Sequence, residues 1–249
     1  MKAYRDRFYR DRHDETRRAA DTILSLVLDL VPPVRSAVDV GCGVGTWLAS
    51  LRDRGVRTVR GLDGPWVPED RLVIPREAFL RVDLGGPLPE LGRFDLAISL
   101  EVAEHLPSER AESFVGSLAA LSDVVLFSAA VPHQGGSHHV NEQWQDHWAR
   151  LFAARGYAVL DAIRPRIWDD AGIAYWYRQN VLLYARKEKL GELRSATGAL
   201  GPTSLPALRT VHPELYLRKI PDSAASGWKM LRRGVRASLR RSLGRRARS

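Results

Sequence analysis

Two glutamates and a histidine stand close together in the stretch SLEVAEHL, at positions 101, 104 and 105. If this stretch opens a helix, Glu101, Glu104 and His105 share one face, because residues three and four apart are neighbours on a helical surface. Neighbouring carboxylates repel each other unless a cation or a proton lies between them. The cluster could therefore bind a metal ion, transfer protons or cap a helix end, and the surrounding segments must decide.

The composition is ordinary for a globular protein, with 45% hydrophobic and 27% charged residues in a chain of 249. No apolar run approaches the roughly 20 residues that span a bilayer, and the N-terminal stretch lacks a signal-peptide core. The single Cys42 forbids an internal disulfide and is typical of a reducing compartment. We therefore expect a cytoplasmic protein.

The net charge of +9 comes from the C-terminal end of the chain. Residues 218–249 hold 11 basic residues and one acid, which leaves 27 basic and 28 acidic residues in the remainder. Within 222–249, apolar residues recur at helical spacing among arginines, at Trp228, Leu231, Val235, Leu239 and Leu243. This pattern predicts an amphipathic helix that binds an anionic membrane surface, peripherally at the inner face. RNA or another polyanion, and a solvated tail, are the alternatives.

Short apolar strands alternate with helical segments between residues 36 and 186. SAVDV, TVRGLDG, FLRVDL, FDLAISL, DVVLFSAAV, YAVLDAIR and QNVLLYAR read as strands, and helical spacing is expected at 12–30, 46–55, 108–121 and 141–156. Such alternation predicts an α/β fold, with a mostly parallel seven-stranded sheet covered by helices on both faces. In such sheets, ligands bind outside the carboxyl ends of the strands.

A glycine-rich turn follows the first predicted strand, in VDVGCGVGTWL. Glycine lets a backbone turn sharply and approach a ligand where a Cβ atom would clash. Gly41, Gly43 and Gly45 fall at every second position after Asp39, which differs from the G-x-G-x-x-G dinucleotide fingerprint. The D-x-G-x-G-x-G pattern resembles motif I of the class I S-adenosylmethionine-dependent methyltransferases, which have a Rossmann-like fold.

This resemblance implies S-adenosyl-L-methionine as cofactor and assigns its binding to Asp39, Gly41, Gly43 and Gly45. It also implies that Asp63 receives the ribose hydroxyls and that Asp83, with Leu84, lies beside the adenine. Ser99 belongs to the fourth-strand motif. We accordingly expect an N-terminal helical segment (1–35) over the cofactor site, a methyltransferase domain (36–187), a linker (188–217) and the basic tail (218–249).

The E-x-x-E-H motif also occurs in relatives that use a divalent cation, including the Hen1 family of RNA 2′-O-methyltransferases. That family adds a histidine after the fifth strand, and His139 in HHVNEQW is the best match, although F-E-W does not follow it here. The resemblance implies a divalent-metal site at Glu101, Glu104, His105 and His139, with Mg²⁺ or Mn²⁺ as the expected ion. Two carboxylates with imidazoles also suit Fe²⁺ or Zn²⁺, and the spacing alone does not choose among them. Without a metal, His105, His133 or His139 would be the catalytic base and the glutamates would be supporting residues.

The segment PRIWDDAGIAYWYRQN lies where this fold usually binds the acceptor, and its candidate substrate residues are Trp168, Tyr175, Trp176 and Arg178. Aromatic faces beside carboxylates suit sugar rings, although they also stack on nucleobases or pack a domain edge. The motifs together resemble bacterial methyltransferases of glycan and natural-product pathways. They predict an O-methyltransferase of a sugar or glycosylated metabolite, assisted by a divalent metal. The alternatives are a Hen1-like RNA 2′-O-methyltransferase and a non-catalytic scaffold.

Overall fold

The structure is a computed structural model that describes residues 2–193 and 202–220. The chain divides into two compact units, Met1–Thr210 and Val211–Ser249. The first unit carries all the elements of the α/β fold. Within the second unit, the described part contains the short helix α8 (Pro213–Lys219), whose His212 side chain accepts a hydrogen bond from the Glu214 backbone.

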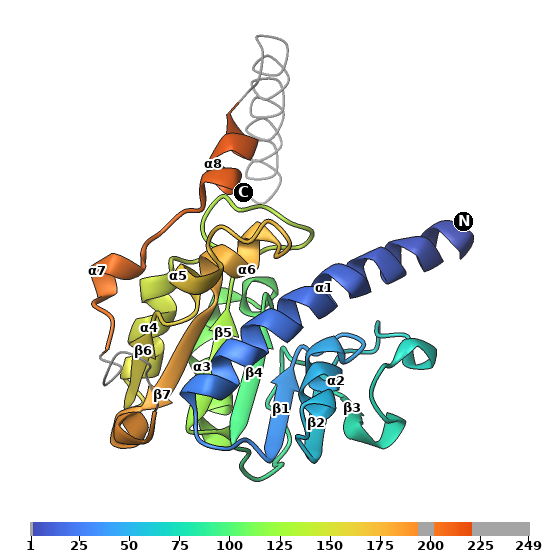
Figure 1. The fold of residues 1–249 in the computed structure, drawn as a ribbon, viewed down its shortest axis with the longest axis horizontal. Helices are drawn as coiled ribbons and strands as arrows, with labels where there is room; N and C mark the ends of the chain where they lie inside the picture. Colours follow the sequence, from blue (N-terminus) through green and yellow to red (C-terminus); the bar gives the residue numbers. More distant parts are fainter. Residues whose placement is uncertain (1, 194–201, 221–249) are drawn as a thin grey trace, which may run out of the picture. The chain divides into compact units, whose positions relative to one another are not determined.

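A seven-stranded sheet forms the centre of the first unit, in the order β3-β2-β1-β4-β5-β7-β6 (Figure 1). β7 runs antiparallel to both β5 and β6, and the remaining neighbours are parallel. The strands are β1 (Ser36–Val40), β2 (Thr58–Asp63), β3 (Phe79–Arg81), β4 (Leu96–Leu100), β5 (Val124–Ser128), β6 (Tyr157–Leu160) and β7 (Leu182–Arg186). All seven predicted strands are present, so the predicted mostly parallel α/β fold is confirmed.

Helices cover both faces of the sheet (Figure 1). Alternate residues of each strand belong to different apolar clusters, since strand side chains point to opposite faces. One face packs against α1 (Lys2–Leu30), α2 (Thr46–Asp53) and α5 (Arg164–Ile167), and the other against α3 (Ala111–Leu121) and α4 (Gln145–Ala153). The remaining helices are α6 (Tyr175–Asn180) and α7 (Leu205–Leu208), with 3₁₀ turns at Glu69–Arg71, Arg76–Ala78, Ala103–His105, Ser108–Arg110 and Lys187–Glu192.

The stretch after β4 corrects one sequence-based expectation. Glu101 has a left-handed backbone with φ of 55°, and only the single turn Ala103–His105 follows it. The two glutamates therefore do not share one face of a regular helix. Similarly, α4 begins at Gln145, whereas helical spacing was expected from residue 141; the backbone N–H of Asn141 donates to the Glu104 carbonyl instead.

The segment predicted as a linker differs from that expectation where it is described. The Thr203 backbone N–H donates to Val159 and its hydroxyl oxygen accepts from the Asp161 N–H, so this segment pairs with the outer edge of β6. Leu208 is fully buried, and its carbonyl accepts from the Arg164 guanidinium. Residues 203–210 are therefore part of the folded unit. The predicted membrane-binding stretch, 222–249, lies outside the described residues. Within the described ranges, no helix is long and apolar enough to cross a membrane.

Candidate active site

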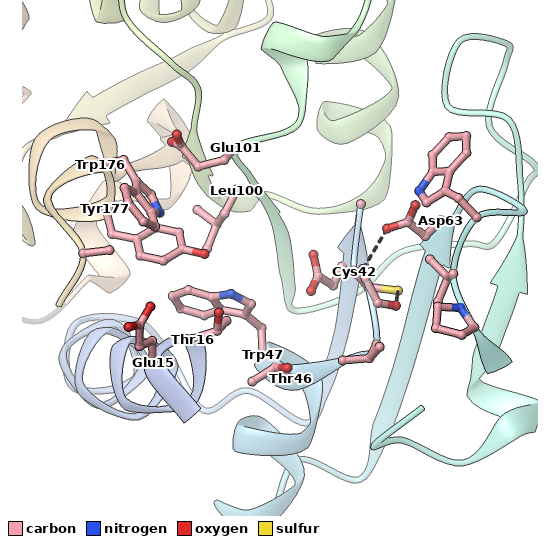
Figure 2. A pocket seen from close by; sticks show the side chains of 18 residues that line it. Glu15, Thr16, Cys42, Thr46, Trp47, Asp63, Leu100, Glu101, Trp176 and Tyr177 are labelled. Carbon is pink, nitrogen blue, oxygen red and sulfur yellow. Dashed lines mark hydrogen bonds between the residues drawn. The ribbon is translucent and has the colours of Figure 1, made fainter. Parts of the chain in front are cut away.

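A cavity of about 670 Å³ opens at the carboxyl ends of the central strands. This size is typical of small-molecule and cofactor sites. The glycine turn after β1 and the acid that ends β2 line one side (Figure 2). The other side is built from α1, the start of α2, the end of β4 and α6, through Glu15, Thr16, Trp47, Glu101, Trp176 and Tyr177.

The glycine turn depends on backbone conformations that side chains disfavour. Gly41 has a φ of +91°, and a Cβ atom there would lie 2.2 Å from Cγ2 of Val102. Gly43 has a φ of +54°, and a Cβ atom there would meet no protein atom within 4 Å. Both line the cavity. The turn therefore leaves room at Gly43 for a ligand that approaches the backbone directly.

Two acids at the strand ends face the same side of the cavity. The Asp63 carboxylate accepts hydrogen bonds from the backbone N–H groups of Gly43 (2.7 Å) and Gly64 (2.6 Å). Asp39 is buried, and its Oδ2 atom makes no hydrogen bond with any described residue. Burial, and then the charge of Asp63, raise the pKa of Asp39 well above its usual value. An unsatisfied buried acid beside an open glycine turn suits a ligand that carries positive charge or donors, as S-adenosylmethionine does.

The other residues assigned to cofactor binding from the sequence do not line the cavity. The Asp83 carboxylate accepts from the Gly85 N–H, and Leu84 is buried in the core beneath α3 and α4. The Ser99 hydroxyl donates to the Val40 carbonyl, which joins β4 to β1. A Cβ atom at Gly45 would meet Ile74. In this structure these residues support the turn and strands around the cavity.

Aromatic side chains form the opposite wall. The rings of Trp47 and Tyr177 meet edge to face with centroids 5.4 Å apart, and Trp176 lies 6.0 Å from Tyr177. Glu15 and Thr16 reach the same wall from α1 (Figure 2). Of the predicted substrate residues, Trp176 lines the cavity. Trp168, Tyr175 and Arg178 do not, and Arg178 donates to the Trp168 carbonyl.

Glu101 joins this wall to a buried network of amides. Its carboxylate accepts hydrogen bonds from Nε2 of Gln134 (3.0 Å) and Nδ2 of Asn180 (3.1 Å). Gln134 lies in the loop after β5, and Asn180 ends α6. Burial raises the pKa of Glu101, and these hydrogen bonds offset part of that rise. The structure thus places Glu101 at the cavity, with its oxygens held by amide donors.

The other three residues assigned to a metal site come together beside Glu101. The candidate ligand atoms of Glu104, His105 and His139 all lie within 4.8 Å of one another. Glu104 is fully buried, and neither carboxylate oxygen makes a hydrogen bond with a described residue. Burial, and then the charge of Glu101, raise its pKa to about 9.

The two histidines of the cluster pack edge to face, with ring centroids 4.8 Å apart. Burial, and then the charge of His139, lower the pKa of His105, which favours its neutral form. A buried carboxylate without partners beside a neutral imidazole is the donor set that a divalent cation requires. The residues present therefore fit a metal ion. His133, the remaining candidate base, is exposed, and its backbone N–H donates to Glu142.

Several residues of the site have no motif that would reveal them in the sequence. Trp66, three residues after Asp63 in the chain, lines the cavity although its side chain is largely exposed. Trp47, Tyr177 and Gln134 reach the site from three distant segments. Their sequence signal is weak, because tryptophan and tyrosine often pack in cores and glutamine is usually found on surfaces, whatever their role. Only Trp66, three residues after Asp63, offered a local cue.

A sheet in this strand order, with its cavity at the carboxyl ends beside a glycine turn, defines the class I methyltransferase fold. Residues 11–162 match the family model of the methyltransferase domain. The chain belongs to this family, and it is an S-adenosylmethionine-dependent methyltransferase. The predicted enzyme class and cofactor are thereby confirmed.

Solved structures of similar fold include DesVI of Streptomyces venezuelae, 17% identical with a TM-score of 0.54, covering 73% of this chain and 96% of that chain. The methyltransferase domain of bacterial CtHen1-C is 19% identical with a TM-score of 0.50, covering 69% and 98%. Magnesium protoporphyrin IX methyltransferase ChlM from Synechocystis PCC 6803 was solved with bound SAM. It is 20% identical with a TM-score of 0.48, covering 70% and 80%. No curated protein sequence matches the chain.

Proposed function

We propose that this methyltransferase transfers the methyl group to a hydroxyl of a sugar or glycosylated metabolite, with help from a divalent cation. The observation that carries the proposal is the Glu104 carboxylate, which is fully buried beside two imidazoles without a hydrogen bond from any described residue. A charged group in such a place costs several kcal/mol unless a cation accompanies it. Glu104, His105 and His139 would hold Mg²⁺ or Mn²⁺.

Bound S-adenosylmethionine supplies an electrophilic methyl carbon on its sulfonium. The acceptor oxygen bonds to that carbon, and the carbon–sulfur bond breaks with its electron pair passing to sulfur, which leaves S-adenosylhomocysteine. The hydroxyl proton passes to Glu101. A cation at the cluster would lower the pKa of a neighbouring hydroxyl. In this proposal, Asp39, the Gly43 backbone and Asp63 orient the cofactor, because transfer requires alignment of the reacting atoms. Glu101 accepts a hydrogen bond from the acceptor on the cavity side.

The aromatic wall supports a ring-shaped acceptor rich in hydroxyls. Trp47, Trp176 and Tyr177 offer apolar faces, while Glu15 and Glu101 offer hydrogen-bond acceptors in the same part of the cavity (Figure 2). Sugar rings combine apolar C–H faces with donors around the edge, so they match both features.

Transfer to the 2′-hydroxyl of an RNA end is the second candidate. The cluster supports it, since the Hen1 family uses the same motif. Among the described residues that line the cavity, however, none is lysine or arginine. Proteins that bind nucleic acids usually neutralise phosphates with such residues.

Calorimetric titration of S-adenosylhomocysteine into chelator-treated protein, followed by Mn²⁺, tests the proposal. We expect the nucleoside to bind without metal, and Mn²⁺ to bind to the wild type but not to Glu104→Gln. Transfer assays would then compare methyl glycosides that carry neighbouring hydroxyls with short RNAs, with and without Mn²⁺. Transfer to RNA alone, or to glycosides at the same rate in chelator, would contradict it.

A further inference from the structure

Glu142 makes three contacts in the loop that carries His139. One carboxylate oxygen accepts hydrogen bonds from the Gly135 backbone (2.7 Å) and approaches Nδ1 of His139 (2.9 Å). The other oxygen accepts from the His133 backbone (2.8 Å). Both carboxylate oxygens of Glu142 are therefore occupied by contacts with this loop.

These contacts determine which nitrogen of His139 carries the proton. A carboxylate can only accept, so Nδ1 donates this hydrogen bond, and Nε2 is the lone-pair nitrogen of the neutral ring. The ring is also confined from other sides. A Cβ atom on Gly136 would lie 2.2 Å from Nε2, and the ring of His105 meets it edge to face. His139 is thus held in one tautomer and one orientation.

The loop requires such support because its backbone is strained. His133 and His138 have φ angles of 69° and 61°, which non-glycine residues adopt at a cost. At the far end of the loop, the backbone N–H groups of Val140 and Asn141 donate to the Glu104 carbonyl at 2.9 and 3.0 Å. These two hydrogen bonds and the contacts of Glu142 hold the loop in place, so His139 lies at a defined distance from Glu104.

We propose that Glu142 is the positioning residue of the metal site, holding His139 as the Nδ1-protonated tautomer and fixing the loop 133–139 that presents it. This inference rests on the metal site of the proposed function. In metal sites generally, a ligand histidine donates its other N–H to a carboxylate or carbonyl, and removing that partner weakens metal binding about 10- to 100-fold.

The test combines Glu142→Ala with two independent measurements. In the metal-free protein, ¹⁵N NMR of labelled histidines reports the tautomer of His139. We expect the Nδ1-protonated pattern in the wild type and a mixture of tautomers in the variant. Calorimetry with Mn²⁺ should show affinity reduced about 10- to 100-fold. Glu109→Ala, at an exposed glutamate, is the matched control and should change neither.

Unchanged affinity for S-adenosylhomocysteine would show that the variant is folded. If Glu142→Ala fails to fold, Glu142→Gln provides a second test, since it keeps the length of the side chain while one of the two acceptor oxygens is replaced by an amide donor. Wild-type affinity for Mn²⁺ in the tested variant, with the Nδ1-protonated pattern intact, would overturn the role of Glu142. If Glu104→Gln also binds Mn²⁺ normally, the proposed metal site itself fails, so the two failures are distinguishable.

Discussion

The two ends of this active site are built by different means. The proposed cofactor end, at Gly41, Gly43 and Asp63, depends on backbone conformation within a short stretch and on one acid about 20 residues further on. The proposed metal end consists of Glu104, His105 and His139, and helix α3 and strand β5 separate Glu104 from His139 in the chain. The first tolerates little change in the backbone, whereas the second depends on side chains and the contacts that hold them. Substitutions at the two ends should therefore fail in different ways.

The largest effect is expected for Gly41→Ala at the cofactor end. The new Cβ atom combines a φ of +91° with a clash at Val102. The strain and displacement of the turn should reduce the affinity for S-adenosylhomocysteine about 30- to 100-fold. Gly55→Ala is the matched control, since Gly55 has a φ of +89° but no atom near its would-be Cβ. It should cost stability and leave the affinity unchanged in calorimetry. Equal losses in both would mean that the backbone strain alone is responsible.

Glu104→Leu should change the proposed metal end without changing the proposed cofactor end. It should abolish Mn²⁺ binding and leave S-adenosylhomocysteine affinity unchanged. In the metal-free state we expect the variant to unfold at least about 2 °C higher than the wild type, because a buried carboxyl group without partners is replaced by an apolar one. Calorimetric scans with and without Mn²⁺ would measure this. A lower melting temperature without metal would mean that the carboxyl group has a stabilising partner in the protein.

Trp176→Ala concerns the acceptor side of the cavity. Loss of one aromatic face should raise KM for the acceptor about tenfold and leave the affinity for S-adenosylhomocysteine unchanged. Trp168→Ala provides the comparison, because Trp168 is in the same predicted segment but does not line the cavity. Steady-state kinetics would measure both. If the two substitutions have equal effects, the acceptor is not bound at this wall.

The smallest effect is expected where α1 meets α2. Asp21 accepts hydrogen bonds from the Ser50 hydroxyl and from Arg17 and Arg54. Burial opposes these contacts, but they lower the pKa of Asp21 to about 2. The folded state then binds fewer protons than the unfolded state, so the added stability is complete above about pH 4 and is lost as the pH falls towards 2.

Asp21→Asn should reduce the free energy of unfolding by about 1 kcal/mol or less at pH 7, since the carboxylate is partly exposed. Urea denaturation between pH 2 and pH 7 would show the difference from the wild type shrinking towards the acid end. A difference that is independent of pH would assign the effect to packing.

The sequence predicted the seven strands and their ligand edge because short apolar stretches alternate with helical segments and the glycines of the turn lie within five residues of one another. It could not place Asp83, Leu84 and Ser99, which resemblance assigned to the cofactor but which the structure finds in supporting contacts. The position of Glu101 was also missed. A left-handed backbone angle at a glutamate has no signal in spacing, and its amide partners Gln134 and Asn180 come from segments 33 and 79 residues away.

The contact between Thr203 and the edge of β6 has one further consequence. β6 is an outer strand of the sheet, and a free strand edge invites pairing with another chain. The backbone of Thr203 and its hydroxyl occupy part of that edge, at Val159 and Asp161. The family match ends at residue 162, well before this segment. A chain shortened to end after β7 would retain the cavity and the metal cluster, yet it would expose the edge of β6 and self-associate. We therefore expect the segment around Thr203, which does not line the cavity, to prevent self-association of the chain.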